Sequence, residues 1–321
     1  MSGSPRSALV IGAGVQGLTT GVLLAEAGRP VHVRSTDHPE GTTSGAGGSM
    51  WGVTFMRPAH RSPAWVARSL EVFRALAEDR SSGVRLLPGT MAARHQLGAE
   101  APRDLRMMPD LRRCEPDELP EGFRDGYRAT LPAVDMPHYL EYLVERLRAA
   151  GGELSVEPVP SLGEAARQAP VVVNCAGIGA RELADDPDVY PLRGQTVLVR
   201  NPGIDEYFVE LTSGPEYATF LPLGSRLVLG GVAISHDWHR AVNSGTTEAI
   251  LNRCAEIDPK LSDAEVLEER VGLRPARTLV RLESEQHRGA QLVHNYGHAR
   301  SGVALSWGCA AEVERLITLA D

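Results

Sequence analysis

The sequence predicts a mixed α/β fold in which a parallel-sheet domain is interleaved with an antiparallel-sheet domain. Three observations support this prediction. A β-α-β pattern with a Gly-rich turn opens the chain between Ala8 and Val33, and such a unit implies parallel strands. The run Pro170–Ala176 (PVVVNCA) is continuously apolar, which is typical of a strand buried on both faces. Short strand patterns then follow one another at Thr196–Arg200, Tyr217–Leu221 and Arg226–Gly230.

Length and composition place the chain among soluble globular proteins. It has 321 residues, of which 42% are hydrophobic and 23% are charged. The net charge of −8 argues against a nucleic-acid partner, because phosphate binding requires a cationic surface. No apolar run approaches 18 residues and the first residues do not resemble a secretory signal, so we expect no membrane segment and a cytoplasmic location. Four cysteines without a CxxC pair favour reduced thiols and no metal site.

The opening unit carries a dinucleotide-binding signature. Ala8–Ile11 is predicted as a strand, and VIGAGVQG places Gly12, Gly14 and Gly17 in GxGxxG spacing at the start of a helical pattern. The first glycine permits a tight turn, the second lets a pyrophosphate approach the backbone, and the third lets helix and strand pack closely. Phosphates would then lie at the positive end of the helix dipole. The sequence therefore predicts a Rossmann-like domain.

The end of the second strand does not decide between the two usual dinucleotides. An acidic residue that binds the ribose is expected about twenty residues after the glycines. Ser35 holds that place, and Asp37 comes two residues later. Asp37 or the Thr36 hydroxyl would suit the ribose of FAD, whereas Arg34 and Ser35 would suit the 2′-phosphate of NADP. Both interpretations remain open from these residues.

The remaining elements are predicted from periodicity and from flanking Gly and Pro residues. The Gly/Ser/Thr-rich stretch Gly41–Val53 is expected to be an ordered loop, because Met50 and Trp51 are embedded in it. Asp135 is expected to cap a helix that ends at Gly151. The other predicted elements are helices over Pro63–Glu78, Thr246–Ile257 and Ala310–Leu319, and strands over Gly83–Arg94, Thr130–Val134 and Leu292–Asn295.

Several motifs identify the chain as resembling a known family. The C-terminal segments VGLRPARTLVRLE (Val271–Glu283) and LVHNYGHARSGVALSWGCAAEV (Leu292–Val313) resemble the signature of the D-amino-acid oxidase family, a group of FAD enzymes that includes glycine oxidase. Further resemblances lie at Thr42–Gly52, Val171–Ala180 and Pro191–Val199. The resemblance implies an FAD-binding domain formed by residues 1–50, 137–191 and 286–321. Residues 51–136 and 192–285 would form the substrate-binding domain.

The resemblance implies non-covalently bound FAD. A helix beginning near Gly302–Leu305 would direct its N-terminus at the N1/C2=O edge of the flavin, where reduction places negative charge. The residues expected to bind the cofactor are Gly12, Gly14, Val15, Gln16, Gly17, Ser35, Asp37, Thr42, Thr43, Ser44, Ala176, Gly177, Arg274, Ala299, Arg300, Ser301, Gly302, Val303 and Ala304.

Substrate recognition is expected to depend on an arginine. Arg274, in GLRP, matches the family's carboxylate-binding arginine, and a guanidinium fork holds a carboxylate through two parallel hydrogen bonds. The family usually adds a tyrosine three residues before a pocket proline, but this chain has Thr219 there. Tyr217 lies two residues earlier, and strand alternation would place it on the same side as Thr219. Tyr217 is therefore a second candidate for the substrate pocket.

Two further departures from the family pattern bear on the substrate. Arg300, in GHARSG, replaces a small residue of D-amino-acid oxidases, although glycine oxidase has an arginine in a similar setting. Arg300 could compensate for the missing tyrosine, bind a second acidic group, or point to solvent with only its carbonyl in use. Trp51 and Gly52 are expected beside the substrate, with Gly52 where the family often has glutamine. Losing that side chain opens space.

The resemblance implies oxidative deamination of a D-amino acid. Hydride passes from Cα to flavin N5, the imine hydrolyses to a keto acid and ammonia, and molecular oxygen is reduced to hydrogen peroxide. No catalytic acid or base is expected, and His294 and His298 are interpreted as structural. The alternatives are a glycine or secondary-amine oxidase, a biosynthetic oxidase with an unusual substrate, an NADP-dependent dehydrogenase, or a flavoprotein without turnover. A homodimer is one option for assembly.

Overall fold

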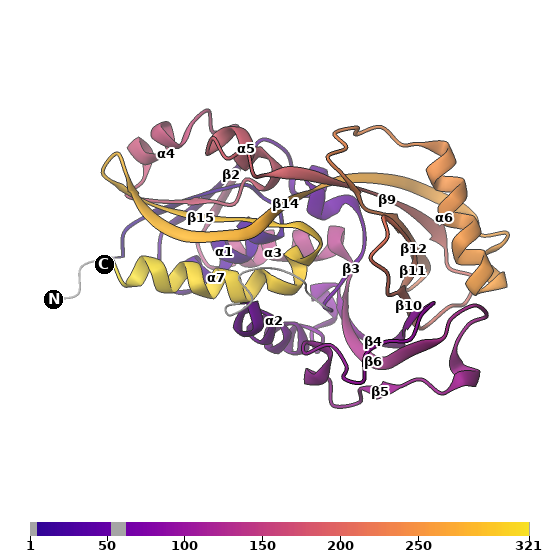
Figure 1. The fold of residues 1–321 in the computed structure, drawn as a ribbon. Coiled ribbons are helices and arrows are strands. Elements are labelled where there is room, and N and C mark those ends of the chain that lie inside the picture. The colour runs from indigo at the N-terminus through magenta and orange to yellow at the C-terminus, as the bar shows by residue number, and fades with distance from the viewer. Residues whose placement is uncertain (1–4, 53–61, 321) are drawn as a thin grey trace.

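A computed structural model describes residues 5–52 and 62–320 of the chain. Within these residues, a single hydrogen-bonded sheet contains 15 strands and runs through the whole molecule (Figure 1). One half of the sheet is parallel and the other half is mostly antiparallel. The predicted mixed α/β fold is therefore confirmed.

The parallel half forms around the first strand. Its strands are β15 (Ala290–His298), β8 (Val171–Asn174), β1 (Ala8–Ile11), β2 (Val31–Ser35) and β7 (Glu153–Val156), in that order across the sheet. Each neighbouring pair is parallel, as the β-α-β opening predicts. All residues of β1 and β8 are buried, which explains why β1 is entirely apolar and β8 is apolar up to its last residue, Asn174.

The other half is mostly antiparallel and contains the longest strands. Its strands are β3 (Ser49–Met50), β6 (Asp125–Val134), β4 (Val84–Ala93), β10 (Tyr207–Glu210), β11 (Glu216–Leu223), β12 (Arg226–Val232), β9 (Tyr190–Arg200) and β14 (Val266–His287). Two further short strands, β5 (Arg112–Arg113) and β13 (Ile234–Ser235), pair with β6 and β9. Neighbours are antiparallel except β4 and β10, which run parallel.

The two halves are joined by one long strand. β14 has 22 residues; its first part pairs with β9 and its second part pairs with β15. Sequence analysis did not predict this strand, because many of its residues are exposed and its pattern does not alternate regularly. β14 continues past residue 285, which was the expected domain boundary. The division into domains stays a prediction.

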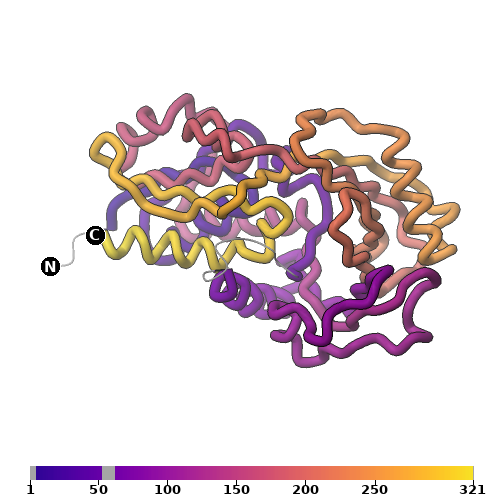
Figure 2. Tube along the Cα trace, in the orientation of Figure 1, coloured from indigo at the N-terminus to yellow at the C-terminus, as the bar shows by residue number. Residues whose placement is uncertain are grey.

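Helices cover both faces of the sheet. α1 (Val15–Glu26), α2 (Ser62–Leu76), α3 (Met136–Ala149) and α7 (Gly302–Thr318) pack in the largest core on one side. α4 (Leu162–Gln168) and α5 (Ala180–Leu183) lie on the opposite side of the parallel half (Figure 1). α6 (Ser244–Ile257) covers the antiparallel half. In Figure 2 the yellow trace of α7 lies alongside the purple trace of α2.

Two details of the helices differ from the sequence analysis. α7 begins at Gly302, eight residues before the predicted start, because the small residues that hide its periodicity are buried. This start agrees with the position that the family resemblance implies. Asp135 occupies the N-cap position of α3, but its carboxylate forms no capping hydrogen bond within the described chain. It instead accepts a hydrogen bond of 2.7 Å from Arg226, so Asp135 stands at the predicted N-cap position but its side chain does not cap the helix.

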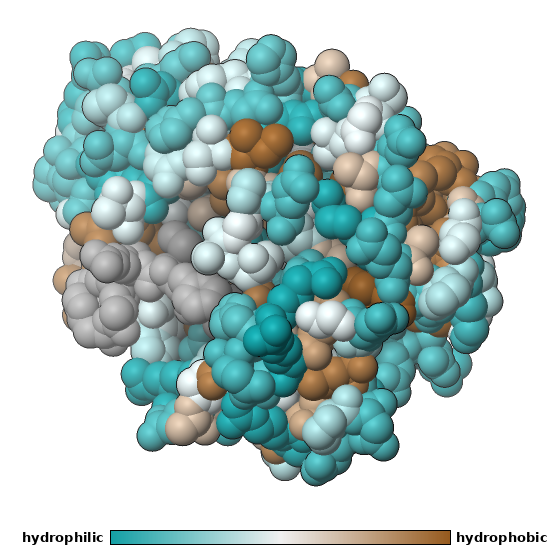
Figure 3. Space-filling view, turned by 45° about the vertical axis from the view of Figure 1, so that its right-hand side comes forward, coloured by the Kyte–Doolittle hydropathy of each residue, from teal (hydrophilic) through white to brown (hydrophobic). Residues whose placement is uncertain are grey.

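The Gly-rich stretch is ordered over its described part and contains a short 3₁₀ turn, Thr43–Ala46, and the strand β3; Val53, its last residue, lies outside the described residues. Among the described helices, none combines the length and apolar character needed to cross a bilayer. The face in Figure 3 is mainly hydrophilic, with hydrophobic residues in small separate groups.

The contact between α2 and α7 depends on one glycine. The amide of Gly308 donates a hydrogen bond of 3.0 Å to the hydroxyl of Ser69, which lies on α2. A Cβ atom at Gly308 would overlap the backbone of Trp65. The neighbouring Trp307 donates a hydrogen bond of 2.8 Å to the hydroxyl of buried Tyr139 on α3. Close approach of the two helix backbones therefore requires glycine at position 308.

We predict that Gly308→Ala lowers the free energy of unfolding by about 1–3 kcal/mol, because the added methyl group forces the two helices apart. Urea unfolding followed by circular dichroism measures the change. The matched control is Gly245→Ala in α6, where the added Cβ makes an ordinary contact of 3.4 Å. The control should be neutral or slightly more stable, since alanine is the better helix former. Equal stability of both variants would contradict the close contact.

Candidate active site

A cavity of about 780 Å³ crosses the carboxyl ends of the parallel strands and continues between the two halves of the sheet. Its walls come from the β1–α1 turn, the end of β2, the residues after β8, the start of α7, and parts of β9 and β14. Ligands of doubly wound sheets bind at the carboxyl ends of the strands. The cavity is therefore the first candidate for a cofactor and substrate site.

The turn after β1 leaves room for a pyrophosphate group. Gly12 has a φ angle of +106°, and a side chain there would clash with the backbone of Cys175. Gly14 precedes α1, whose first turn contains no acidic residue. Gly17 does not line the cavity in the described residues; it packs against Gly12, where a Cβ would overlap the carbonyl oxygen. These positions match the three glycine roles inferred from the sequence.

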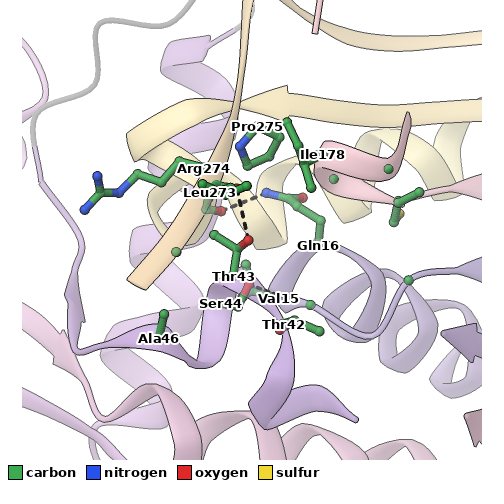
Figure 4. Close-up of a pocket in the computed structure, with 18 of the residues that line it drawn as sticks. Val15, Gln16, Thr42, Thr43, Ser44, Ala46, Ile178, Leu273, Arg274 and Pro275 are labelled. Carbon is green, nitrogen blue, oxygen red and sulfur yellow. Dashed lines mark hydrogen bonds between the residues drawn. The ribbon is translucent and has the colours of Figure 1, made fainter. Parts of the chain in front are cut away.

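The Gly-rich loop is attached to both the turn and the sheet. The amide of Val15 donates a hydrogen bond of 3.0 Å to Ser44 Oγ. Thr43 Oγ1 donates a bond of 3.0 Å to the carbonyl of Leu273 on β14, as Figure 4 shows. The hydroxyl of Thr196 on β9 donates to the carbonyl of Ala46 at 3.1 Å. Thr42, Thr43 and Ser44 therefore line the cavity in fixed positions.

The N-terminus of α7 reaches the same cavity. The side-chain amide of Gln16 donates a hydrogen bond of 2.7 Å to the carbonyl of Gly302, which brings the starts of α1 and α7 together. Ala299 lies in the turn before α7 with a φ of +46°. Of the expected residues, Ala176, Gly177, Ala299, Arg300, Gly302 and Val303 line the cavity, whereas Ser301 and Ala304 are absent from its described lining.

The end of β2 favours a free ribose over a ribose phosphate. Arg34, Ser35, Thr36 and Asp37 all line the cavity. The guanidinium of Arg34 donates hydrogen bonds of 2.7 Å to Gln168 and 2.9 Å to the carbonyl of Pro158. These hydrogen bonds use the terminal donors of Arg34 that would otherwise bind a 2′-phosphate. Ser35 and the exposed Asp37 remain as hydroxyl and carboxylate groups for a ribose.

Three residues of the cavity wall carry a buried polar atom that lacks a partner among the described residues. These atoms are Nε of Arg34, Nε2 of His298 and Oδ1 of Asn295. Burial lowers the pKa of His298 to about 3, so its ring is neutral at physiological pH. Buried polar atoms of this kind require a hydrogen-bonding partner. Together with the glycine turn, they fit a bound dinucleotide with a polar ring system such as FAD.

At the other end of the cavity, the structure brings Arg274, Tyr217 and Arg300 together. Arg274 donates hydrogen bonds of 3.1 Å to the carbonyl of Val232 and 3.5 Å to the hydroxyl of Tyr217. Its side chain extends away from Gln16 in Figure 4. Gly194 leaves the space that the guanidinium occupies. The Cζ atom of Arg300 lies 4.5 Å from the centroid of the Tyr217 ring.

Tyr217 is buried between these two positive charges. Its exposed fraction is 6%. Burial acts to raise the pKa of Tyr217, but the charges of Arg274 and Arg300 outweigh it, and the pKa is lowered. The phenol therefore offers a strongly polarised O–H group beside Arg274. A carboxylate at this point would meet one guanidinium fork and one hydroxyl donor.

Four expected substrate residues, Tyr217, Thr219, Trp51 and Gly52, lie outside the described lining of the cavity. Tyr217 is connected to the cavity through its contacts with Arg274 and Arg300. Thr219 Oγ1 donates a hydrogen bond of 2.7 Å to the carbonyl of Phe208, which satisfies its hydroxyl within the sheet. The ring of Trp51 is fully buried and donates to the carbonyl of Val66 at 3.1 Å. A Cβ at Gly52 would have no neighbour within 4 Å among the described residues. The expected role of Gly52 beside the substrate stays a prediction.

Sequence reasoning missed several residues of the cavity wall. These include Thr196, Arg240, Arg270, Asn295 and Tyr296. Asn295 and Tyr296 lie in the same NYGHAR motif as Arg300, so the motif itself was the signal that could have found them. Arg240 had no sequence signal, because it reaches the cavity on a loop held by buried Arg193 through the carbonyls of His239 and Ala241.

A hydrogen-bond network around Asp186 holds the β14–β15 hairpin in place. Tyr296 donates a hydrogen bond of 2.7 Å to Asp186 and accepts one of 2.8 Å from Arg281. Arg277 also binds Asp186, at 3.0 Å. Burial acts to raise the pKa of Asp186, but these partners outweigh it and lower the pKa. Arg277 and Arg281 thus have structural partners.

The described residues contain no His, Cys, Asp and Glu cluster suited to a metal ion.

Comparisons with known proteins agree with this site. The family model described as FAD-dependent oxidoreductase (DAO) matches residues 7–316. A D-amino-acid oxidase of Rubrobacter xylanophilus is 45% identical over 310 residues, which cover 96% of this chain and 95% of the relative. A D-amino-acid oxidase of Streptomyces coelicolor is 44% identical over 312 residues, with the same coverage of both chains.

A solved structure shows the same fold. Glycine oxidase from Geobacillus kaustophilus superposes with a TM-score of 0.79 at 21% identity, covering 99% of this chain and 95% of that one. The family match spans nearly the whole sequence, and it includes both the dinucleotide turn and the segment that carries Arg274. The chain therefore belongs to the D-amino-acid oxidase family of FAD-dependent oxidoreductases.

Proposed function

We propose that this enzyme oxidises D-amino acids, giving an imino acid that hydrolyses to a keto acid and ammonia, with hydrogen peroxide formed from molecular oxygen. The observation that carries the proposal is the Arg274–Tyr217 pair at the end of a cavity that begins at the dinucleotide turn. The names of the relatives, D-amino-acid oxidase at 45% and 44% identity, support the same substrate class.

FAD supplies the acceptor for a hydride from the substrate Cα and the route by which electrons reach oxygen. The chain would hold it without a covalent bond. Gly12 and Gly14 leave space for the pyrophosphate, and Ser35 and Asp37 face the ribose end. The N-terminus of α7, which has no acidic residue in its first turn, presents the positive end of its dipole to the cavity.

Arg274 is proposed to hold the substrate α-carboxylate. Its fork offers two parallel N–H donors, and the hydroxyl of Tyr217 provides a third donor beside it. A carboxylate held at several points cannot rotate freely, so the Cα–H bond takes one orientation in the cavity. Binding therefore pre-orients the reacting groups, and this lowers the entropic part of the activation barrier.

No side chain is proposed as general base. His298 lines the cavity, but it is neutral and would pick up a proton only near pH 3. His294 is buried on β15, with its ring nitrogens 3.4 Å from Asn174 and from Glu285. Burial also lowers the pKa of His294. The substrate amine would therefore react in its neutral form, having lost its proton to solvent before hydride transfer.

The alternative functions that the sequence left open can be tested with other substrates. Glycine and sarcosine test for a glycine or secondary-amine oxidase, and NADP⁺ reduction tests for a dehydrogenase. A biosynthetic role with an unusual amino acid, a homodimeric assembly and a cytoplasmic location remain proposals from the sequence. The engaged guanidinium of Arg34 speaks against NADP.

We predict that the purified protein is yellow and that denaturation releases its flavin. Because the glycine turn can hold the pyrophosphate without a covalent bond, the chromophore should separate from the chain. Absorbance of the supernatant after acid precipitation and chromatography against FAD measure this. Colour that stays with the precipitated chain would contradict non-covalent binding, and a colourless protein that FAD does not restore would contradict the cofactor site.

We predict that Arg274→Met lowers kcat/KM for the best D-amino acid by about 30-fold to several thousand-fold, because losing a buried charged partner costs about 2–5 kcal/mol. Arg274→Lys should fall between wild type and Arg274→Met, since it keeps the charge but loses the fork. Peroxide production under steady-state conditions measures both.

Arg68→Met provides the control, because Arg68 lies exposed on α2 and pairs only with Glu71 in the described structure. Its activity should equal that of wild type. Wild-type kcat/KM in Arg274→Met, with FAD content unchanged, would remove Arg274 from the substrate site.

A further inference from the structure

We propose that Arg300 selects D-amino acids with a carboxylate in the side chain. The inference rests on the proposed function and narrows its substrate class. Arg274 would bind the α-carboxylate, and Arg300 would bind the second carboxylate. The preferred substrates are then acidic D-amino acids rather than neutral ones.

The position of Arg300 is defined by the turn between β15 and α7. Ala299, with its φ of +46°, begins this turn, and Arg300 follows it directly. Arg300 is exposed, and its guanidinium lies over the ring of Tyr217. Cation–π contacts of this kind hold arginine side chains in place. Arg300 therefore occupies a defined point on the cavity wall.

The ring of Tyr217 separates two guanidinium groups. Arg274 approaches its hydroxyl at 3.5 Å, and Arg300 lies 4.5 Å from its centroid. Both arginines line the same cavity. A ligand that reaches Arg274 with one end has Arg300 about one phenol ring away. That separation suits a molecule with two carboxylates joined by a short carbon chain.

The positive charges of Arg274 and Arg300 are not neutralised by nearby carboxylates of the described residues. In the described part of the chain, neither Arg274 nor Arg300 has a carboxylate partner, although other arginines of the molecule do, such as Arg226 with Asp135 and Arg277 with Asp186. The α-carboxylate of a bound amino acid neutralises one of the two charges. A neutral side chain leaves the other guanidinium facing the ligand without a counter-charge, whereas a side-chain carboxylate provides it.

Hydrogen-bonding chemistry points the same way. A carboxylate offers acceptors to both arms of the guanidinium fork. The isosteric amide offers one acceptor oxygen, and its NH₂ group is a donor that faces the N–H donors of arginine. Acid and amide of the same size should therefore be distinguished by Arg300. Because Arg300 is exposed, screening by water and salt reduces the difference.

The experiment compares kcat/KM for D-aspartate against D-asparagine, and for D-glutamate against D-glutamine, by peroxide production. We expect wild type to favour the acid of at least one pair by about tenfold or more, equivalent to about 1.4 kcal/mol. Arg300→Met should bring this acid-to-amide ratio close to one. Arg300→Lys should retain part of the preference, because the charge remains while the fork is lost.

Arg240→Met is the matched control. Arg240 also lines the cavity and is exposed, but in the described part of the chain no contact links it to Tyr217. Its removal lowers the positive charge of the cavity by the same amount, so the ratio should stay within about twofold of wild type if Arg300 acts by direct contact. Equal loss of the ratio in Arg240→Met and Arg300→Met would assign the preference to the general field of the cavity and overturn the proposal.

A second readout does not depend on turnover. Succinate and succinamate are compared as non-oxidisable ligands of the FAD-loaded protein, by the change they cause in the flavin absorbance spectrum. Succinate should bind about tenfold more tightly than succinamate to wild type, and equally to Arg300→Met. Oxidation of neutral D-amino acids without any acidic preference would overturn this inference and leave the proposed function intact. Failure to oxidise any D-amino acid would overturn the proposed function itself.

Discussion

The site depends on the hydrogen bonding of one strand to both halves of the sheet. β14 pairs with β9 through the residues before Ala276 and with β15 through the residues that follow. This continuity places Arg274 opposite Leu192, and it places Leu273 where its carbonyl accepts from Thr43. The residues that face the cofactor and those that face the substrate are thereby held in one register. A shift of one residue along β14 would reverse which side chains enter the cavity.

Charge is distributed unevenly along the cavity. At the β2 end, Asp37 and Arg34, whose guanidinium is hydrogen-bonded to Gln168, face the space for a ribose. At the other end, Arg274 contacts the hydroxyl of Tyr217 and Arg300 lies over its ring. A chain with a net charge of −8 thus concentrates positive charge where an anionic substrate would bind. The same electrostatics lower the pKa of Tyr217 against the effect of its burial.

The sequence predicted the parts of the fold that follow from local patterns. The strand β1, the turn glycines and the buried strand β8 were correct because steric and apolar requirements act within a few residues. The C-terminal motif led to Arg274 and Arg300 through the family resemblance. Features set by distant contacts were missed: the pairing of Asp135 with Arg226, the long strand β14, and the entry of Arg240 into the cavity. Each depends on a partner that local sequence does not reveal.

The shared strand also limits how such a protein can change in evolution or by engineering. A crossover between two relatives that falls between residues 266 and 287 would combine the first part of one β14 with the second part of another. The two parts must keep the spacing that aligns β9 with β15, so insertions there would displace one half of the molecule against the other. Productive recombination junctions are therefore expected in surface turns such as Arg288–Gly289, where the chain is exposed and already leaves the sheet.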